Sequence, residues 1–99
     1  MTSKPARKYS TWFKWFQRGK PWPHRLIVVA VRWRDATRAD DLSDAATILA
    51  MTVGIVMEAT PDHIKIAAEV FEDRSSRDIT TIPAGMIERV GNLATMDVA

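Results

Sequence analysis

Side chains able to perform acid–base, metal or nucleophilic chemistry are few in this sequence and lie far apart. His24 and His63 are the only histidines, and neither has a second ligand three or four residues away, as a metal site on a helix requires. Adjacent acids occur in polar stretches, where nothing apolar would raise a carboxyl pKa, at Asp40 with Asp41 and at Glu72 with Asp73. Ser75 and Ser76 have no base nearby, and there is no glycine-rich phosphate loop. We therefore expect no enzymatic activity, no cofactor and no metal.

Composition indicates one ordinary globular domain. The chain has 99 residues, of which 46% are hydrophobic and 26% charged. Cysteine is absent, which excludes disulfides, a thiol nucleophile and a cysteine-based zinc site. The longest apolar run, LIVVAV over residues 26–31, is far shorter than the ~20 residues of a transmembrane helix, and no apolar h-region follows the basic start. We expect a cytoplasmic protein without a signal peptide.

Charge is distributed unevenly along the chain. Residues 1–24 contain six basic residues and no acid, a net charge of +6, whereas residues 25–99 contain eight basic and twelve acidic residues, a net charge of −4. Basic terminal arms commonly contact polyanions. The alternative is that the arm lies against its own acidic body or against a neighbouring subunit.

Aromatic and basic residues alternate in the segment YSTWFKWFQRGKPWPH, residues 9–24. If this arm binds nucleic acid, Lys14, Arg18 and Lys20 would neutralise phosphates, and Trp12, Trp15 or Trp22 would stack on bases. A membrane surface is a less favoured partner, because one short helix with a single basic pair is a weak anchor.

A second interpretation of the same aromatic residues is structural. Trp12, Phe13 and Phe16 would share one face of a helix, because residues three and four apart are neighbours on a helix surface. Three exposed aromatic rings would favour aggregation, so we expect these three to pack on the domain. Trp15 and Trp22 are not explained in this way.

The first half of the chain predicts two helices and a strand. Ser10 or Thr11 is expected to cap the first helix, which would end at Gly19 before an extended connector over residues 20–23. Apolar residues at every second position then predict a strand with one buried face, formed by Ile27, Val29, Val31 and Trp33. A short second helix over residues 41–51, capped by Asp41 or Ser43, is expected within an insertion over residues 35–51.

The second half predicts four strands over residues 52–59, 64–72, 79–83 and 86–90, and the tail has no strong signal. In the first of them Val53, Ile55 and Met57 share a face, and Gly54 allows a bend or a close backbone approach. The inward residues of the next strand are expected to be Ile64, Ile66, Ala68 and Val70. Domain boundaries follow: a basic arm over residues 1–24, a barrel over 25–91 and a tail over 92–99.

A helix followed by five strands, with a glycine early in the second strand (TVGIVMEA) and a tight turn between the last two (IPAGMI), resembles the Sm-like (LSm) barrel over about residues 26–90. It is also similar to small proteins of phages and prophages. The resemblance implies a mainly β protein: a five-stranded Sm-like or SH3-like barrel with an N-terminal helix and a short helical insertion. It further implies a homo-oligomer, such as a ring, encoded by a phage or its bacterial host, and single-stranded RNA as the ligand.

The residues that bind RNA in that family are only partly matched. The family uses an asparagine before the third strand and an arginine at the corner between the last two strands. Matching IKIA to the third strand places His63 near the asparagine position, where it would stack on a base or bond to it. Matching IPAG to the corner places Pro83 at the arginine position, and proline offers neither charge nor donor.

Two functions remain open from the sequence. The first is an oligomeric, non-enzymatic module that binds RNA or other nucleic acid through the basic arm. The second is a structural or adaptor protein of a virion or host complex, which docks by the arm and by an exposed strand edge, RDITTI, without nucleic acid.

Overall fold

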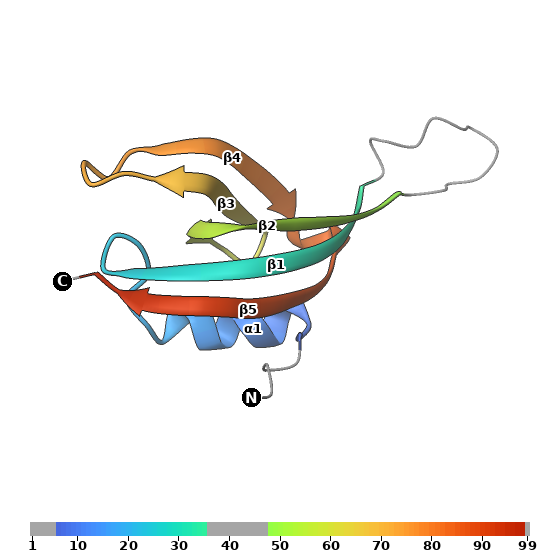
Figure 1. Ribbon diagram of the computed structural model, residues 1–99. Helices are drawn as coiled ribbons and strands as arrows, with labels where there is room; N and C mark the ends of the chain where they lie inside the picture. The colour runs from blue at the N-terminus through green and yellow to red at the C-terminus, as the bar shows by residue number, and fades with distance from the viewer. Residues whose placement is uncertain (1–5, 36–47, 99) are drawn as a thin grey trace.

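The computed structural model describes residues 6–35 and 48–98 of the chain. The elements in chain order are α1 (Tyr9–Gln17), β1 (Arg25–Asp35), β2 (Ile48–Ala59), β3 (His63–Val70), β4 (Ser76–Pro83), the single 3-10 turn η2 (Ala84–Met86) and β5 (Ile87–Asp97). The five strands form one antiparallel sheet in the order β4-β3-β2-β1-β5 (Figure 1). The expected mainly β fold with an N-terminal helix is confirmed.

The sheet must be strongly curled, because η2 joins its two edge strands directly. Only three residues lie between Pro83, the last residue of β4, and Ile87, the first of β5. Four peptide steps reach at most about 14 Å, whereas the outer strands of a flat five-stranded sheet are about 19 Å apart. The edge strands therefore approach each other at this end, and the sheet forms the wall of a small barrel.

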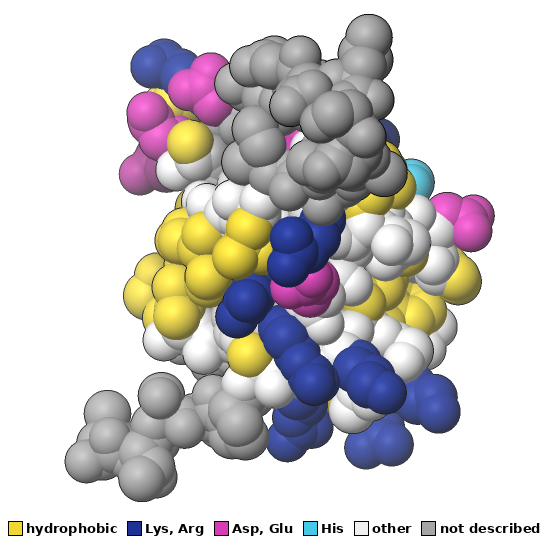
Figure 2. All heavy atoms as spheres, turned by 90° about the vertical axis from the view of Figure 1, so that its right-hand side faces the viewer, with side chains coloured by type: hydrophobic (Ala, Val, Ile, Leu, Met, Phe, Trp, Pro, Cys, Tyr) yellow, Lys and Arg dark blue, Asp and Glu magenta, His cyan; other side chains and the backbone are white. Residues whose placement is uncertain are grey.

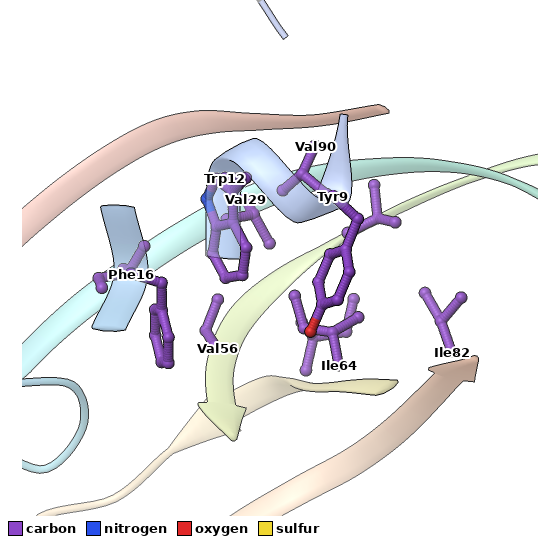
Figure 3. Packing of buried hydrophobic residues seen from close by; sticks show 11 residues of the cluster. Tyr9, Trp12, Phe16, Val29, Val56, Ile64, Ile82 and Val90 are labelled. Atoms are coloured by element: carbon purple, nitrogen blue, oxygen red, sulfur yellow. The ribbon is translucent and has the colours of Figure 1, made fainter. Parts of the chain in front are cut away.

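Helix α1 lies behind the sheet and closes the core (Figures 1 and 3). Its buried side chains are Tyr9, Trp12 and Phe16, whose rings stack with centroid distances of 5.8 Å for Tyr9 and Trp12 and 5.0 Å for Trp12 and Phe16. The sheet contributes Ile27, Val29, Val31, Val56, Ile64, Ile66, Ile82 and Val90. The expected packing role is thus confirmed for Trp12 and Phe16, and the half-buried Phe13 also packs against this core, with its ring centroid 5.9 Å from that of Tyr9.

The helix begins two or three residues earlier than the sequence predicts. Lys8 is the N-cap and makes no side-chain cap, so the expectation that Ser10 or Thr11 caps the helix is wrong. The reason is tertiary: Tyr9 is drawn into the core, and its hydroxyl lies 2.6 Å from the carbonyl oxygen of Thr60 and 2.8 Å from that of His63. Packing of an aromatic face outweighs the modest gain from a capping hydroxyl.

The expected second helix is contradicted where the structure describes it. Residues 48–51 belong to β2 and pair with Arg32–Asp35 of β1, as in the pairs Trp33 with Ala50 and Arg34 with Leu49. The indole N–H of Trp33 also donates to Thr52 Oγ1 at 2.9 Å. Pairing with the long β1 strand gives these residues backbone hydrogen bonds, and this gain is larger than the weak preference of a short segment for a helix. Residues 36–47 lie outside the described part of the chain.

Two further expectations about the strands are corrected. β5 runs to Asp97, paired with Arg25 of β1, so most of the segment assigned to a tail is strand. In β3, Ala67 is buried and Ala68 is exposed, the reverse of the prediction for Ala68. β3 pairs with β2 only from Ile64 to Ala67, whereas it pairs with β4 as far as Val70. From Ala68 onward the β3–β4 hairpin therefore extends past β2, and the Ala68 side chain is exposed.

Gly54 has the role that the sequence indicates. A Cβ at this position would lie 2.8 Å from the backbone oxygen of Ala67, which cannot move without shifting β3. Gly54 and Val56 face the core, so Val53, Ile55 and Met57 lie on the other side of β2, where Val53 is 56% exposed. The glycine therefore lets β2 and β3 approach closely at the point where the sheet curls.

Candidate functional site

A groove of about 750 Å³ runs along α1. We call it the helix groove. One wall comes from one face of α1 and its N-cap, because residues three, four and seven apart share a helix face: Lys8, Ser10, Phe13, Lys14 and Gln17. The opposite wall comes from the β2–β3 turn, η2 and the start of β5, through Pro61, Ala84, Ile87 and Glu88. The groove thus joins a half-buried aromatic ring to two exposed lysines.

The net charge of the helix groove is positive. Among the described residues that line it, Glu88 is the only acid, and this carboxylate is engaged by Arg34 Nε at 2.7 Å and by Arg32 Nε at 3.2 Å. The hydrogen bond from Arg34 is the main cause that holds the Glu88 pKa below its ordinary value. Lys8 and Lys14 make no ion pair with an acid of the described residues. An anion in the groove would therefore meet lysines whose charge is not already compensated.

The walls of the groove are fixed to each other by hydrogen bonds. The Tyr9 hydroxyl ties the start of α1 to the carbonyl of Thr60, and the Ala84 N–H donates to the Asp62 carbonyl at 2.8 Å. Thr60 also closes the β2–β3 turn, since its Oγ1 accepts the N–H of Asp62 at 3.1 Å. A groove held open in this way loses little conformational entropy when it binds a ligand.

Tyr9 is the one strongly perturbed titratable group of the site. Burial raises its pKa from 10.0 to about 12. The neutral phenol is therefore favoured in the folded state, and its contribution to stability is complete below pH 10 and disappears as the pH rises toward 12. Tyr9 thus anchors the helix at physiological pH rather than acting as an acid or base.

We expect the tyrosinate absorbance to report this shift directly, because Tyr9 is the only tyrosine in the chain. The folded protein should titrate near pH 12 and the urea-unfolded protein near pH 10. The free energy of unfolding should also fall with pH across this interval. Tyr9→Phe is the matched control, since it keeps the ring and should reduce the fall. Titration of the folded protein at the ordinary value would show that Tyr9 is not buried.

The structure divides the predicted site residues between two places. Lys14 lies on the helix groove, whereas Arg18 is the C-cap residue of α1 and Lys20 follows the helix. All three side chains are exposed, and none pairs with an acid of the described residues. Figure 2, which views the molecule from the side where α1 begins, shows further Lys and Arg side chains gathered over the lower part of that face. The basic residues of the arm thus remain available to a polyanion.

Neither of the predicted tryptophans Trp15 and Trp22 lines the groove: Trp15 lies in α1 but on another face of the helix, and Trp22 follows the helix. Trp15 is half-buried, and the guanidinium carbon of Arg25 lies 5.4 Å from its ring centroid, a cation–π contact that covers one ring face. A Cβ at Gly19 would overlap that guanidinium, which shows how closely Arg25 lies against the end of α1. Trp22 is half-buried in the turn that follows. Arg25 is not among the site residues that the sequence predicts, because it lies at the start of strand β1 and outside the basic arm.

His63 is separated from these residues and lies beside the carboxylate of Glu58. It opens β3, and its Nε2 lies 3.6 Å from Glu58 Oε1 while its Nδ1 lies 3.5 Å from Thr60 Oγ1. Glu58 also pairs with Lys65 at 3.5 Å. A carboxylate at this place repels phosphate, so the geometry does not favour His63 as a base-stacking residue.

Lys8 and Phe13 are the groove residues that the sequence reasoning missed. Lys8 precedes the helix that the sequence predicts, and the spacing of Phe13 places it with the core aromatics. The spacing of Ser10, Phe13, Lys14 and Gln17 identifies the groove face of the helix. The sequence does not show that this face of α1 borders a groove, because the opposite wall includes η2, whose position no local sequence pattern predicts.

Other kinds of site have no support among residues 6–35 and 48–98. These residues contain no group of three or more His, Asp or Glu side chains placed to hold a metal ion. None of their helices has the length and apolar character needed to span a membrane. Comparison with protein-family models, with curated proteins and with solved structures finds no match for this chain.

Proposed function

We propose that this protein is a non-enzymatic nucleic-acid-binding module that holds single-stranded RNA, or a similar single strand, along α1. The observation that carries the proposal is the helix groove, in which Phe13 lies between the uncompensated lysines Lys8 and Lys14. A single strand offers the complementary chemistry, a phosphate at each step and a flat base beside it. Stacking of a base on an aromatic ring is worth about 1–3 kcal/mol, and the lysines would add the electrostatic attraction.

The surroundings of the groove support a strand longer than one nucleotide. Arg18 and Lys20 continue the positive surface past the C-terminal end of α1, and Arg7 precedes Lys8 at the other end. The helix contains no acidic residue that would repel a phosphate. A strand that follows α1 would thus meet cations along its whole length.

The experiment is a titration of a fluorescently labelled single-stranded RNA, read by anisotropy, with wild-type protein and with Phe13→Leu. Leucine keeps an apolar side chain on the helix but removes the ring, so we expect an affinity about tenfold lower with an unchanged salt dependence. Trp22→Leu is the control on an aromatic residue outside the groove. An equal effect of both substitutions, or of neither, would contradict a base stacked on Phe13.

A second candidate function is docking to a protein partner without nucleic acid. It is favoured by the exposed side chains of the edge strand β4, among them Arg77, Asp78 and Ile79. Salt separates the two functions, because phosphate contacts make the affinity fall steeply with ionic strength, whereas a protein contact centred on an apolar side chain such as Ile79 depends on it weakly.

A further inference from the structure

The face of the sheet that points away from α1, which we call the outer face, contains a row of apolar side chains. Directly opposed residues of neighbouring strands lie on the same face. One row of such residues crosses all five strands and contains no polar side chain: Ile79, Ala67, Ile55, Val28 and Ala94. Next to this row, Val53 of β2 pairs with Ala30 of β1, which in turn pairs with Gly91 of β5.

Several large side chains on this outer face are exposed. Met51 is 64% exposed, Leu93 58%, Val53 56% and Ile79 52%. The apolar run over residues 26–31 of β1 is typical of a strand buried on both faces, yet α1 and the core cover only one. Soluble monomers rarely expose continuous apolar surfaces of this kind without a partner. Figure 2 shows the corresponding apolar cluster beside the basic side chains.

The edges of the sheet are poorly suited to bind another copy. On β5, the backbone of Arg7 already bonds to Val90, with N···O distances of 2.9 and 2.7 Å. On β4, Asp78 has a left-handed backbone with φ 57°, and Pro83 has no N–H to donate. These features are ones by which edge strands avoid pairing. Association through strand edges, as a ring would use, is therefore less favoured than association through the outer face.

The outer face also has the complementary shape that a symmetric contact needs. A hollow of about 310 Å³ lies over Ala30 and Gly91, between Met51 on one side and Leu93 on the other. A symmetric interface must carry both the protruding and the receiving part on the same patch. Methionine is unbranched and adapts to such gaps. Arg32 and Arg89 also line the hollow, and the charge of Arg32 is compensated by Glu88 at 3.2 Å.

We propose that a second copy of this chain packs against the outer face, so that Met51 of each copy enters the hollow over Ala30 and Gly91 of the other. The contact buries the apolar row on both copies. A nucleic acid would find no cation within the row, which is why the occupant we infer is an identical apolar surface.

Sedimentation equilibrium from low to high micromolar protein tests this dimer. We expect the wild-type mass to rise from 11.2 kDa toward twice that value, and the double variant Met51→Lys with Leu93→Lys to stay at 11.2 kDa. Phe71→Lys is the control, because Phe71 is exposed in the β3–β4 hairpin and away from the row. Circular dichroism checks that the double variant is folded, and glutamine replaces lysine at both positions if it is not.

Three results would overturn the proposal. They are a wild-type mass of 11.2 kDa at every concentration, a mass of five or more chains, or a dimer that persists in the folded double variant. Hydrogen exchange adds a second criterion, since a dimer through the outer face leaves the amides of the β4 edge unprotected. RNA binding is measured separately on the same double variant, so failure of the dimer and failure of the proposed function are distinguishable.

Discussion

Replacing Trp12 by alanine is expected to lower the free energy of unfolding by about 3–5 kcal/mol, the usual cost of removing a large buried aromatic side chain. Trp12 is 2% exposed, stacks on Tyr9 and Phe16, and donates its indole N–H to Asn92 Oδ1 at 2.8 Å. Domains of this size have a total stability of about 5–15 kcal/mol, so this variant should be partly unfolded near physiological temperature. Urea unfolding followed by circular dichroism measures the change.

Two matched variants identify the cause of that loss. Trp12→Phe keeps a ring in the core but loses the hydrogen bond to Asn92, so we expect a clearly smaller loss than for alanine. Trp15→Ala removes a half-buried ring beside Arg25 and should also cost less. A loss below about 1 kcal/mol for Trp12→Ala would contradict the packing of α1 on the sheet, and with it the helix groove.

The double charge reversal Lys8→Glu with Lys14→Glu is expected to weaken binding of single-stranded RNA by about tenfold or more. Both lysines line the helix groove and neither is compensated by an acid of the described residues. Because each neutralised phosphate contributes about 0.7 to the slope of log K against log salt for single strands, the slope should become shallower by about 1.4. Anisotropy titrations at several salt concentrations measure both quantities.

The control for this variant makes the same change in net charge elsewhere. Arg74→Glu with Arg77→Glu reverses two exposed cations at the β3–β4 hairpin, away from α1. We expect little change in affinity for this control. Equal weakening by both double variants would mean that net charge alone, rather than the groove, governs binding.

The parts of the fold that local patterns determine could be predicted from the sequence. Alternation in β1 identifies Ile27, Val29 and Val31 as buried, and the spacing of Trp12 and Phe16 identifies the buried face of α1. Gly54 was expected to allow a close backbone approach, and it does.

The parts that depend on distant partners could not be predicted. The local pattern of residues 48–51 favours a helix and residues 92–97 have no strong signal, but both segments become strands because they pair with the two edges of the long β1 strand. Of the site residues, exposed cations such as Lys14 could be predicted from the excess of basic residues in the N-terminal arm. The groove could not be predicted, because its opposite wall includes η2, which lies far from α1 in the sequence. Its positive charge could not be predicted either, because it depends on the ion pairs of Glu88 with Arg32 and Arg34 from another strand.

The most direct test of the central claim is the salt dependence of the affinity of wild-type protein for a labelled single-stranded RNA. If a strand follows α1 and contacts Arg7, Lys8, Lys14, Arg18 and Lys20, the slope of log K against log salt should be about −3.5. The double reversal of Lys8 and Lys14 should reduce it to about −2.1. Undetectable binding at low salt, or a slope near zero, would contradict the claim that the helix groove binds nucleic acid.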